Sequence, residues 1–106
     1  MYSVGLGVET DKTRAAEFFK MSCDAGSAYG CSNLGVLVIL GTGAKQDDSL
    51  GLELFTRACD GNFYEGCYYL GLLFQRGEVI KQDEQQANAL FVKSCEGGYA
   101  RGCERI

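Results

Sequence analysis

Cysteine recurs along this chain of 106 residues with a fixed period, and that period constrains the fold more than any other feature. The six cysteines form three pairs, and successive pairs are 36 residues apart. A period of roughly 20–50 residues is typical of solenoids, whose repeats stack along one axis and contact only their neighbours. The spacing therefore predicts a repeat protein. The cysteines are Cys23, Cys31, Cys59, Cys67, Cys95 and Cys103.

Other residue types recur in register with the cysteines. The recurring columns are Gly5, Gly41 and Gly77; Asp11, Asp47 and Asp83; Phe19, Phe55 and Phe91; and Gly30, Gly66 and Gly102. They divide a single repeat domain over residues 1–106 into three repeats, 5–40, 41–76 and 77–106. Residues 1–4 align with the tail of a preceding helix, and the third repeat ends six residues short of a full unit. We therefore expect either a slice of a longer array or a small array with unusual ends.

Each repeat predicts two helices joined by a tight turn. The recurring aspartate, Asp11 in the first repeat, is a favourable N-cap, and apolar residues follow it at helical spacing up to the first cysteine. A glycine-containing turn ends this helix, and a second helix runs to the next recurring glycine. Gly35 and Gly71 fall inside that second helix, where they predict a contact with the partner helix too close for a side chain. The fold class expected is all-α, an α/α superhelical solenoid of about three 36-residue helix-turn-helix repeats.

The repeat also favours one disulfide pattern among the 15 that six cysteines allow. Each pair spans the turn of its own helical hairpin, and antiparallel helices joined by a tight turn can bring two Cα atoms within disulfide range. The predicted bridges are Cys23–Cys31, Cys59–Cys67 and Cys95–Cys103. Three disulfides in a short chain are typical of an oxidising compartment, here periplasmic or extracellular, with a signal peptide outside this chain.

Composition argues against several function classes. The chain has no histidine, and zinc ligands within a pair are usually two to four residues apart, so no metal or other cofactor is expected. The net charge is −4 and no basic run occurs, which argues against a nucleic-acid partner. The longest apolar run, residues 34–40, is too short to span a membrane. No catalytic constellation of nucleophile and base is visible.

Several motifs resemble the Sel1-like repeat, in particular its disulfide-bearing branch, the Helicobacter cysteine-rich proteins. The residues that carry the resemblance are Gly5-Leu-Gly-Val-Glu-Thr-Asp11, Ala15-Ala16-x-Phe18-Phe19, Cys23-x7-Cys31 and Leu34-Gly35. The resemblance covers the whole chain and departs from the usual pattern at Ala44, Gly51 and Glu78-Val79. It implies a superhelix related to tetratricopeptide arrays, usually exported and serving protein–protein recognition.

The resemblance also implies an alternative function, because some members of the family are described as β-lactamases or penicillin-binding proteins. The serine β-lactamase signatures are Ser-x-x-Lys, Ser-Asp-Asn and Lys-Thr-Gly. None of the three occurs in this sequence. A β-lactamase-like hydrolase therefore stays an alternative that the resemblance alone supports.

A helical wheel of the first helix in each repeat predicts the surface that binds a partner. Three columns lie opposite the buried stripe and vary while the buried columns recur, as expected of a concave surface that binds a protein or peptide. A solvated helix face is the alternative interpretation. Met21 and Leu50 favour contact, because apolar residues at these positions have no evident packing role. The predicted binding residues are Arg14, Glu17, Met21, Leu50, Glu53, Arg57, Gln86 and Lys93.

The open end of the array predicts a further property. Because the third repeat lacks the final turns of its second helix, we expect the face of Leu90, Phe91 and Ile106 to be incompletely covered. Exposed apolar patches favour association, so weak self-association through the repeat ends is expected. A purely structural role within a longer array is a third interpretation of the chain.

Overall fold

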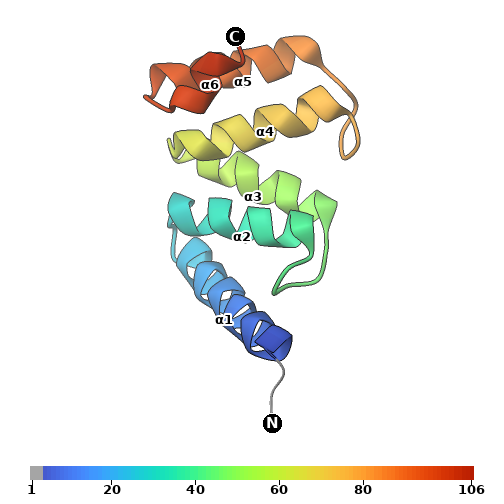
Figure 1. Ribbon diagram of the computed structural model, residues 1–106. Helices are drawn as coiled ribbons and strands as arrows, with labels where there is room; N and C mark the ends of the chain where they lie inside the picture. Colours follow the sequence, from blue (N-terminus) through green and yellow to red (C-terminus); the bar gives the residue numbers. More distant parts are fainter. Residues whose placement is uncertain (1–3) are drawn as a thin grey trace.

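The computed structural model describes the backbone of residues 4–106 and the side chains of residues 11–106. Six α-helices and no strands occur in this part of the chain (Figure 1). Each helix packs on the helices before and after it in the chain, which builds an elongated stack measuring 50 × 27 × 22 Å. The all-α solenoid is therefore confirmed. The helices are α1 (Val4–Asp24), α2 (Ala28–Leu40), α3 (Asp48–Asp60), α4 (Tyr64–Arg76), α5 (Glu84–Glu96) and α6 (Ala100–Glu104).

The predicted helix starts are confirmed in the second and third repeats. The Asp47 carboxylate accepts a hydrogen bond from the backbone N–H of Leu50, and Asp83 does the same for Gln86, each at 3.0 Å. The backbone N–H of Asp47 in turn donates to the Val38 carbonyl at 2.9 Å, which fixes the loop against the preceding helix. Each aspartate therefore both starts its helix and anchors the loop before it.

The predicted helix start at Asp11 is wrong. Helix α1 begins at Val4, so residues 5–10, which precede the expected helix start, are helical. In the later repeats the loop before the helix start is held by bonds to the preceding second helix, such as that from Asp47 to Val38. No helix precedes α1 in the described residues, so these bonds have no counterpart there and the helix continues through the segment.

The mid-helix glycines mark close contacts between repeats. A Cβ atom added to Gly35 would lie 2.7 Å from Cε1 of Phe55, and one added to Gly71 would lie 2.8 Å from the same atom of Phe91. The close contact predicted for these glycines is therefore confirmed, but its partner is the first helix of the next repeat and not the first helix of the same hairpin. These two glycines set the spacing between hairpins.

The end of the array is better covered than the sequence indicates. Phe91 is only 2% exposed and Leu90 is half-buried, whereas Ile106 is 64% exposed. The Arg105 guanidinium lies 5.9 Å from the ring centroids of both Phe91 and Tyr68, within the range of a cation–π contact. The expectation that the whole face stays open is wrong for Phe91, because Arg105 and Tyr68 cover its ring.

No helix in the described part of the chain has both the length and the apolar character required to cross a membrane.

Candidate functional site

All three predicted disulfides are present, one in each hairpin. The paired Cα atoms are 4.5, 4.5 and 4.6 Å apart, and no free cysteine occurs in the described residues. Glycine allows this close approach, because a Cβ atom on Gly66 would lie 2.7 Å from the Cβ atom of Ala58 across the hairpin. The first two bridges are buried, whereas Cys95 is half-buried and Cys103 is exposed. The last bridge is therefore the one that solvent reaches.

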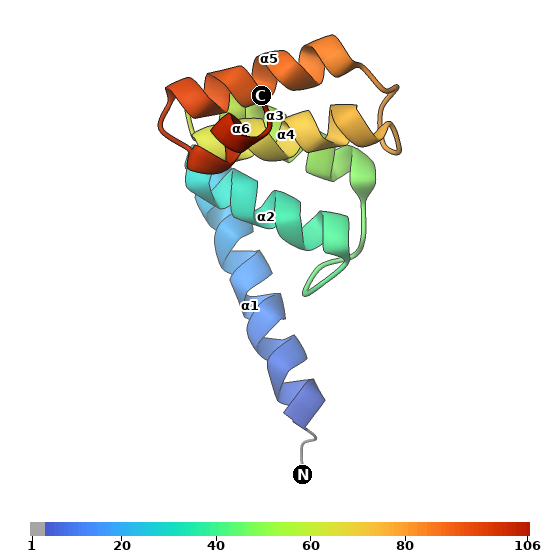
Figure 2. The ribbon, with the colours of Figure 1, turned by 45° about the horizontal axis from the view of Figure 1, so that its top comes forward.

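A groove of about 540 Å³ lies between the first helices of repeats one and two. Its lining residues lie on α1 on one side and on α3 and the loop before it on the other, with α2 between them. Figure 2 shows how α2 lies against α1 in the stack. The apolar lining of the groove comes from all three helices. These apolar residues are Ala16, Leu34, Val38, Leu50 and Leu54.

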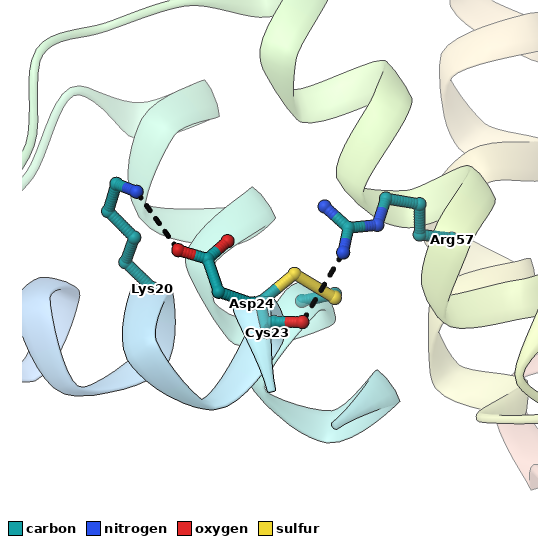
Figure 3. Close-up of polar contacts among 5 residues, drawn as sticks. Lys20, Cys23, Asp24 and Arg57 are labelled. Carbon is teal, nitrogen blue, oxygen red and sulfur yellow. Dashed lines mark hydrogen bonds and ion pairs between the residues drawn. A yellow bond between two sulfur atoms is a disulfide. The ribbon is translucent and has the colours of Figure 1, made fainter. Parts of the chain in front are cut away.

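Two polar contacts fix one end of the groove, as Figure 3 shows. Lys20 and Asp24, on successive turns of α1, form an exposed ion pair with an N···O distance of 3.1 Å. From α3, Arg57 reaches across and donates through Nη2 to the Cys23 carbonyl at 3.3 Å. That carbonyl belongs to the last turn of α1, where a positive charge interacts favourably with the helix dipole. Arg57 therefore joins the two walls.

Two carboxylates lie in the groove without a partner. Glu17 on α1 and Glu53 on α3 both line it and both are exposed. They are 36 residues apart, so they occupy equivalent positions on successive first helices. Neither takes part in an ion pair or hydrogen bond within residues 11–106. Each wall of the groove therefore carries one carboxylate that no ion pair within residues 11–106 compensates.

The groove contains four of the eight predicted binding residues, Glu17, Leu50, Glu53 and Arg57. The other four lie outside it and are exposed, and Met21 reaches 71% exposure. The interpretation that Leu50 lacks a packing role is wrong, because Leu50 is half-buried against the core cluster that includes Leu34 and Val38. The residues outside the groove are Arg14, Met21, Gln86 and Lys93.

The sequence-based wheel missed several residues of the groove. On α1 the lining residues Thr13, Glu17, Lys20 and Asp24 follow one another at spacings of four, three and four, which is a helical stripe. On α1 the predicted columns therefore differ by about one position from the face that lines the groove, whereas on α3 the predicted residues Leu50, Glu53 and Arg57 all line it. The acid–base spacing of Lys20 and Asp24 is the signal that could have found this face. Lys45, in the loop that joins α2 to α3, was also missed.

A second, mostly apolar hollow of about 250 Å³ lies between the second helices α2 and α4. Val36 and Leu40 on α2 and Leu72 on α4 line it together with the Phe55 and Tyr69 rings. Burial, and then the negative charge of Glu65, raise the pKa of the Tyr69 hydroxyl above its ordinary value. Tyr69 is therefore neutral at physiological pH, and Arg76 is the one charged side chain among the residues that line the hollow.

The described residues give no support to hydrolysis. The two buried serines, Ser32 and Ser94, do not line the groove, and the Ser94 hydroxyl donates to the Phe91 carbonyl at 2.9 Å within its own helix. Within the same part of the chain, no three acidic or cysteine side chains gather as a metal site would require.

The Sel1 repeat family matches residues 1–27, 28–63 and 65–99 of the chain. Each of the last two matches spans a second helix and the first helix of the following repeat. The family model therefore has the same period as the repeats defined above and places the boundary between repeats at a different residue. Among curated proteins, none matches this sequence.

Several solved structures share the fold. Cysteine-rich protein B of Helicobacter pylori is 27% identical with a TM-score of 0.80, over 86% of this chain and 68% of that protein. A Sel1 repeat protein from Oxalobacter formigenes is 28% identical with a TM-score of 0.83, over 92% of this chain and 40% of its own. A protective antigen of uropathogenic Escherichia coli with an SLR fold is 26% identical with a TM-score of 0.77, over 82% and 19%.

Proposed function

This chain belongs to the Sel1 repeat family, and we propose that it is a disulfide-stapled scaffold that binds a protein or peptide segment in the groove between α1 and α3. The observation that carries the proposal is the groove itself, with an apolar lining and charged side chains on both walls. Binding sites commonly combine a mostly apolar hollow with a few polar groups that orient the ligand. A groove lined from two successive first helices lets an extended segment contact several side chains on each wall.

One disulfide and one hydrogen bond support this function because they hold the helices around the groove in place. The Cys23–Cys31 bridge ties α1 to α2, and the Arg57 bond ties α3 to the end of α1. Both walls are thus fixed to one another before any ligand arrives. A rigid site loses less conformational entropy on binding than a flexible one, which favours affinity for a short peptide.

We also propose a periplasmic or extracellular location. Disulfides persist in oxidising compartments and are rare in the cytosol of most organisms. Three bridges close the three hairpins, and a cysteine-rich protein of Helicobacter pylori is among the structural neighbours. Fractionation of the producing cell tests this location, and recovery of the protein with reduced thiols from the cytosol would contradict it.

We propose, finally, that the repeat ends associate weakly. Phe18 is 60% exposed, whereas Leu54 in the equivalent position of the next repeat is 2% exposed because the preceding hairpin covers it. Ile106 is exposed at the other end. Sedimentation velocity at rising concentration should reveal a weak dimer that Phe18→Ser abolishes, and a strict monomer at all concentrations would contradict the proposal.

Selection of peptides tests the binding function. A random-peptide phage library is selected on the oxidised protein. The affinity of the enriched peptides is then measured for the unchanged protein and for four variants, among them Leu50→Arg, which puts a charge on the apolar lining. We expect Leu50→Arg and Arg57→Ala to weaken binding, and Arg14→Ala and Gln85→Arg, both outside the groove, to leave it unchanged. Enriched peptides that bind all four variants equally would contradict the groove as the site. Circular dichroism on each variant establishes that it is folded.

A further inference from the structure

We propose that the groove selects a segment with a basic side chain, which lies between Glu17 and Glu53. This inference rests on the proposed binding function and names the chemistry of the partner. It starts from the two carboxylates, which face one groove from opposite walls and have no partner within the described side chains.

Four of the other charged side chains that line the groove already have structural roles. Lys20 and Asp24 pair with each other, Asp47 accepts the N–H of Leu50 at the start of α3, and Arg57 donates to the end of α1. Lys45 lines the groove from the loop that joins α2 to α3. Glu17 and Glu53 thus remain as two like charges on opposite walls, and Lys45 is the one other lining charge outside these contacts. A cation placed between them relieves their repulsion and interacts with both.

Lysine and arginine fit this position in a second respect. Their charged heads are carried on apolar stems that can lie along apolar surface while the head reaches polar groups. The apolar part of the same lining includes Leu34, Val38 and Leu50. One basic side chain can therefore contact the apolar lining with its stem and the two carboxylates with its head. A small inorganic cation would use only the charges.

The pair of carboxylates occurs once in the array. In the third repeat the position equivalent to Glu53 is Ala89, and the position equivalent to Leu50 is Gln86. The neighbouring first helices α3 and α5 therefore offer one glutamate and one alanine where α1 and α3 offer two glutamates. This difference assigns the basic side chain to the α1–α3 groove and fixes where a bound segment lies along the array.

A set of blocked peptides tests the proposal. The probe is fluorescein-labelled acetyl-Leu-Gly-Lys-Gly-Leu-amide, and two further probes replace its lysine with norleucine, which has the same stem length without the charge, or with glutamate. Exposed ion pairs contribute little each, so two of them predict that the lysine probe binds about tenfold more tightly than the norleucine probe. The glutamate probe should bind most weakly. Fluorescence anisotropy gives the three dissociation constants.

Two double variants separate the glutamates from general charge effects. Glu17→Gln with Glu53→Gln should abolish the preference for lysine over norleucine. Glu78→Gln with Glu96→Gln makes the same change in net charge outside the groove and should preserve the preference. Because all four glutamates are exposed, both variants should fold, and their thermal midpoints establish this.

The possible outcomes distinguish this inference from the function on which it rests. Equal binding of the lysine and norleucine probes, both lost in Leu50→Arg, would overturn the charge selectivity and leave the peptide-binding groove intact. Preference for the glutamate probe, or a lysine preference that survives the Glu17 and Glu53 changes, would also overturn it. Failure of all three probes to bind would overturn the inference, while the phage selection decides the binding function separately.

Discussion

The middle hairpin (α3–α4) and the last hairpin (α5–α6) carry the same recurring residues in different surroundings. The first-helix rings Phe55 and Phe91 are 3% and 2% exposed, so they are equally buried. The second-helix cysteines differ, since Cys67 is fully buried and Cys103 is exposed. The phenylalanine packs on the glycine of the preceding repeat, whereas Cys67 lies in a cluster against which Val79 and Leu90 of the following repeat pack. Burial in a first helix therefore depends on the repeat before it, and burial in a second helix depends on the repeat after it.

The recurring phenylalanine ring is covered from the same repeat position in both hairpins, by a tyrosine in the middle hairpin and by an arginine in the last. Tyr69 stacks on Phe55 with ring centroids 5.3 Å apart. Arg105 is the equivalent residue 36 positions later, and its guanidinium lies 5.9 Å from the Phe91 centroid. Arg105 also donates through Nη1 to the Gln75 side chain at 3.1 Å. An arginine covers an aromatic face while its head stays in water, which suits the end of the stack.

The largest expected effect tests whether first-helix burial is independent of the following repeat. Phe55→Ala should destabilise the protein by about 3–5 kcal/mol through loss of buried surface and the cavity that remains. Phe91→Ala should cost a similar amount, because both rings pack on a glycine of the preceding repeat. Urea unfolding of the oxidised protein, followed by circular dichroism, measures both values. If Phe91→Ala lowers the free energy of unfolding by less than half as much as Phe55→Ala, burial in the first helix depends on the following repeat as well.

The three disulfides should differ in how fast a reductant attacks them more than in how much each lowers the entropy of the unfolded chain. All three close loops with a sequence separation of 8 residues, so the chain-entropy estimate is about 2.6 kcal/mol for each. Access to a reductant differs, because Cys103 alone is exposed. Under limiting phosphine, Cys95–Cys103 should therefore be reduced first. Alkylation followed by peptide mapping gives the order, and earlier reduction of Cys59–Cys67 would contradict the burial argument.

The smallest effect concerns the bond between repeats one and two. Arg57→Ala removes the hydrogen bond to the Cys23 carbonyl and should cost no more than about 1 kcal/mol, because the side chain is exposed. Lys93 is its equivalent in the third repeat and makes no such bond to Cys59, so Lys93→Ala should leave the thermal midpoint unchanged. If the two variants are equally stable, the Arg57 bond has no structural weight. If Arg57→Ala costs as much as Phe55→Ala, Arg57 belongs to the core.

Most of the fold could be predicted from the sequence, because residues that recur every 36 positions occupy equivalent packed positions in each repeat. The caps at Asp47 and Asp83, the turns and the three disulfides follow from local chemistry that repeats at one spacing. The start of α1 could not be predicted in this way, because the loop in later repeats depends on a preceding helix. The α1 face of the groove differs by about one position from the predicted columns, since its orientation depends on how α2 and α3 pack against α1. Leu50 illustrates the same limit, because its packing role depends on residues in α2.

The central claim is that the α1–α3 groove, and not the equivalent side of α3 and α5, binds a segment with a basic side chain. Titration of isotope-labelled protein with the lysine probe, followed by amide chemical shifts, tests it residue by residue. We expect the amide chemical shifts of Glu17, Leu50 and Glu53 to change, and those of Gln86 and Ala89 to stay the same. Shifts centred on Gln86 and Ala89, or on Val36 and Leu72 in the second hollow, would contradict it.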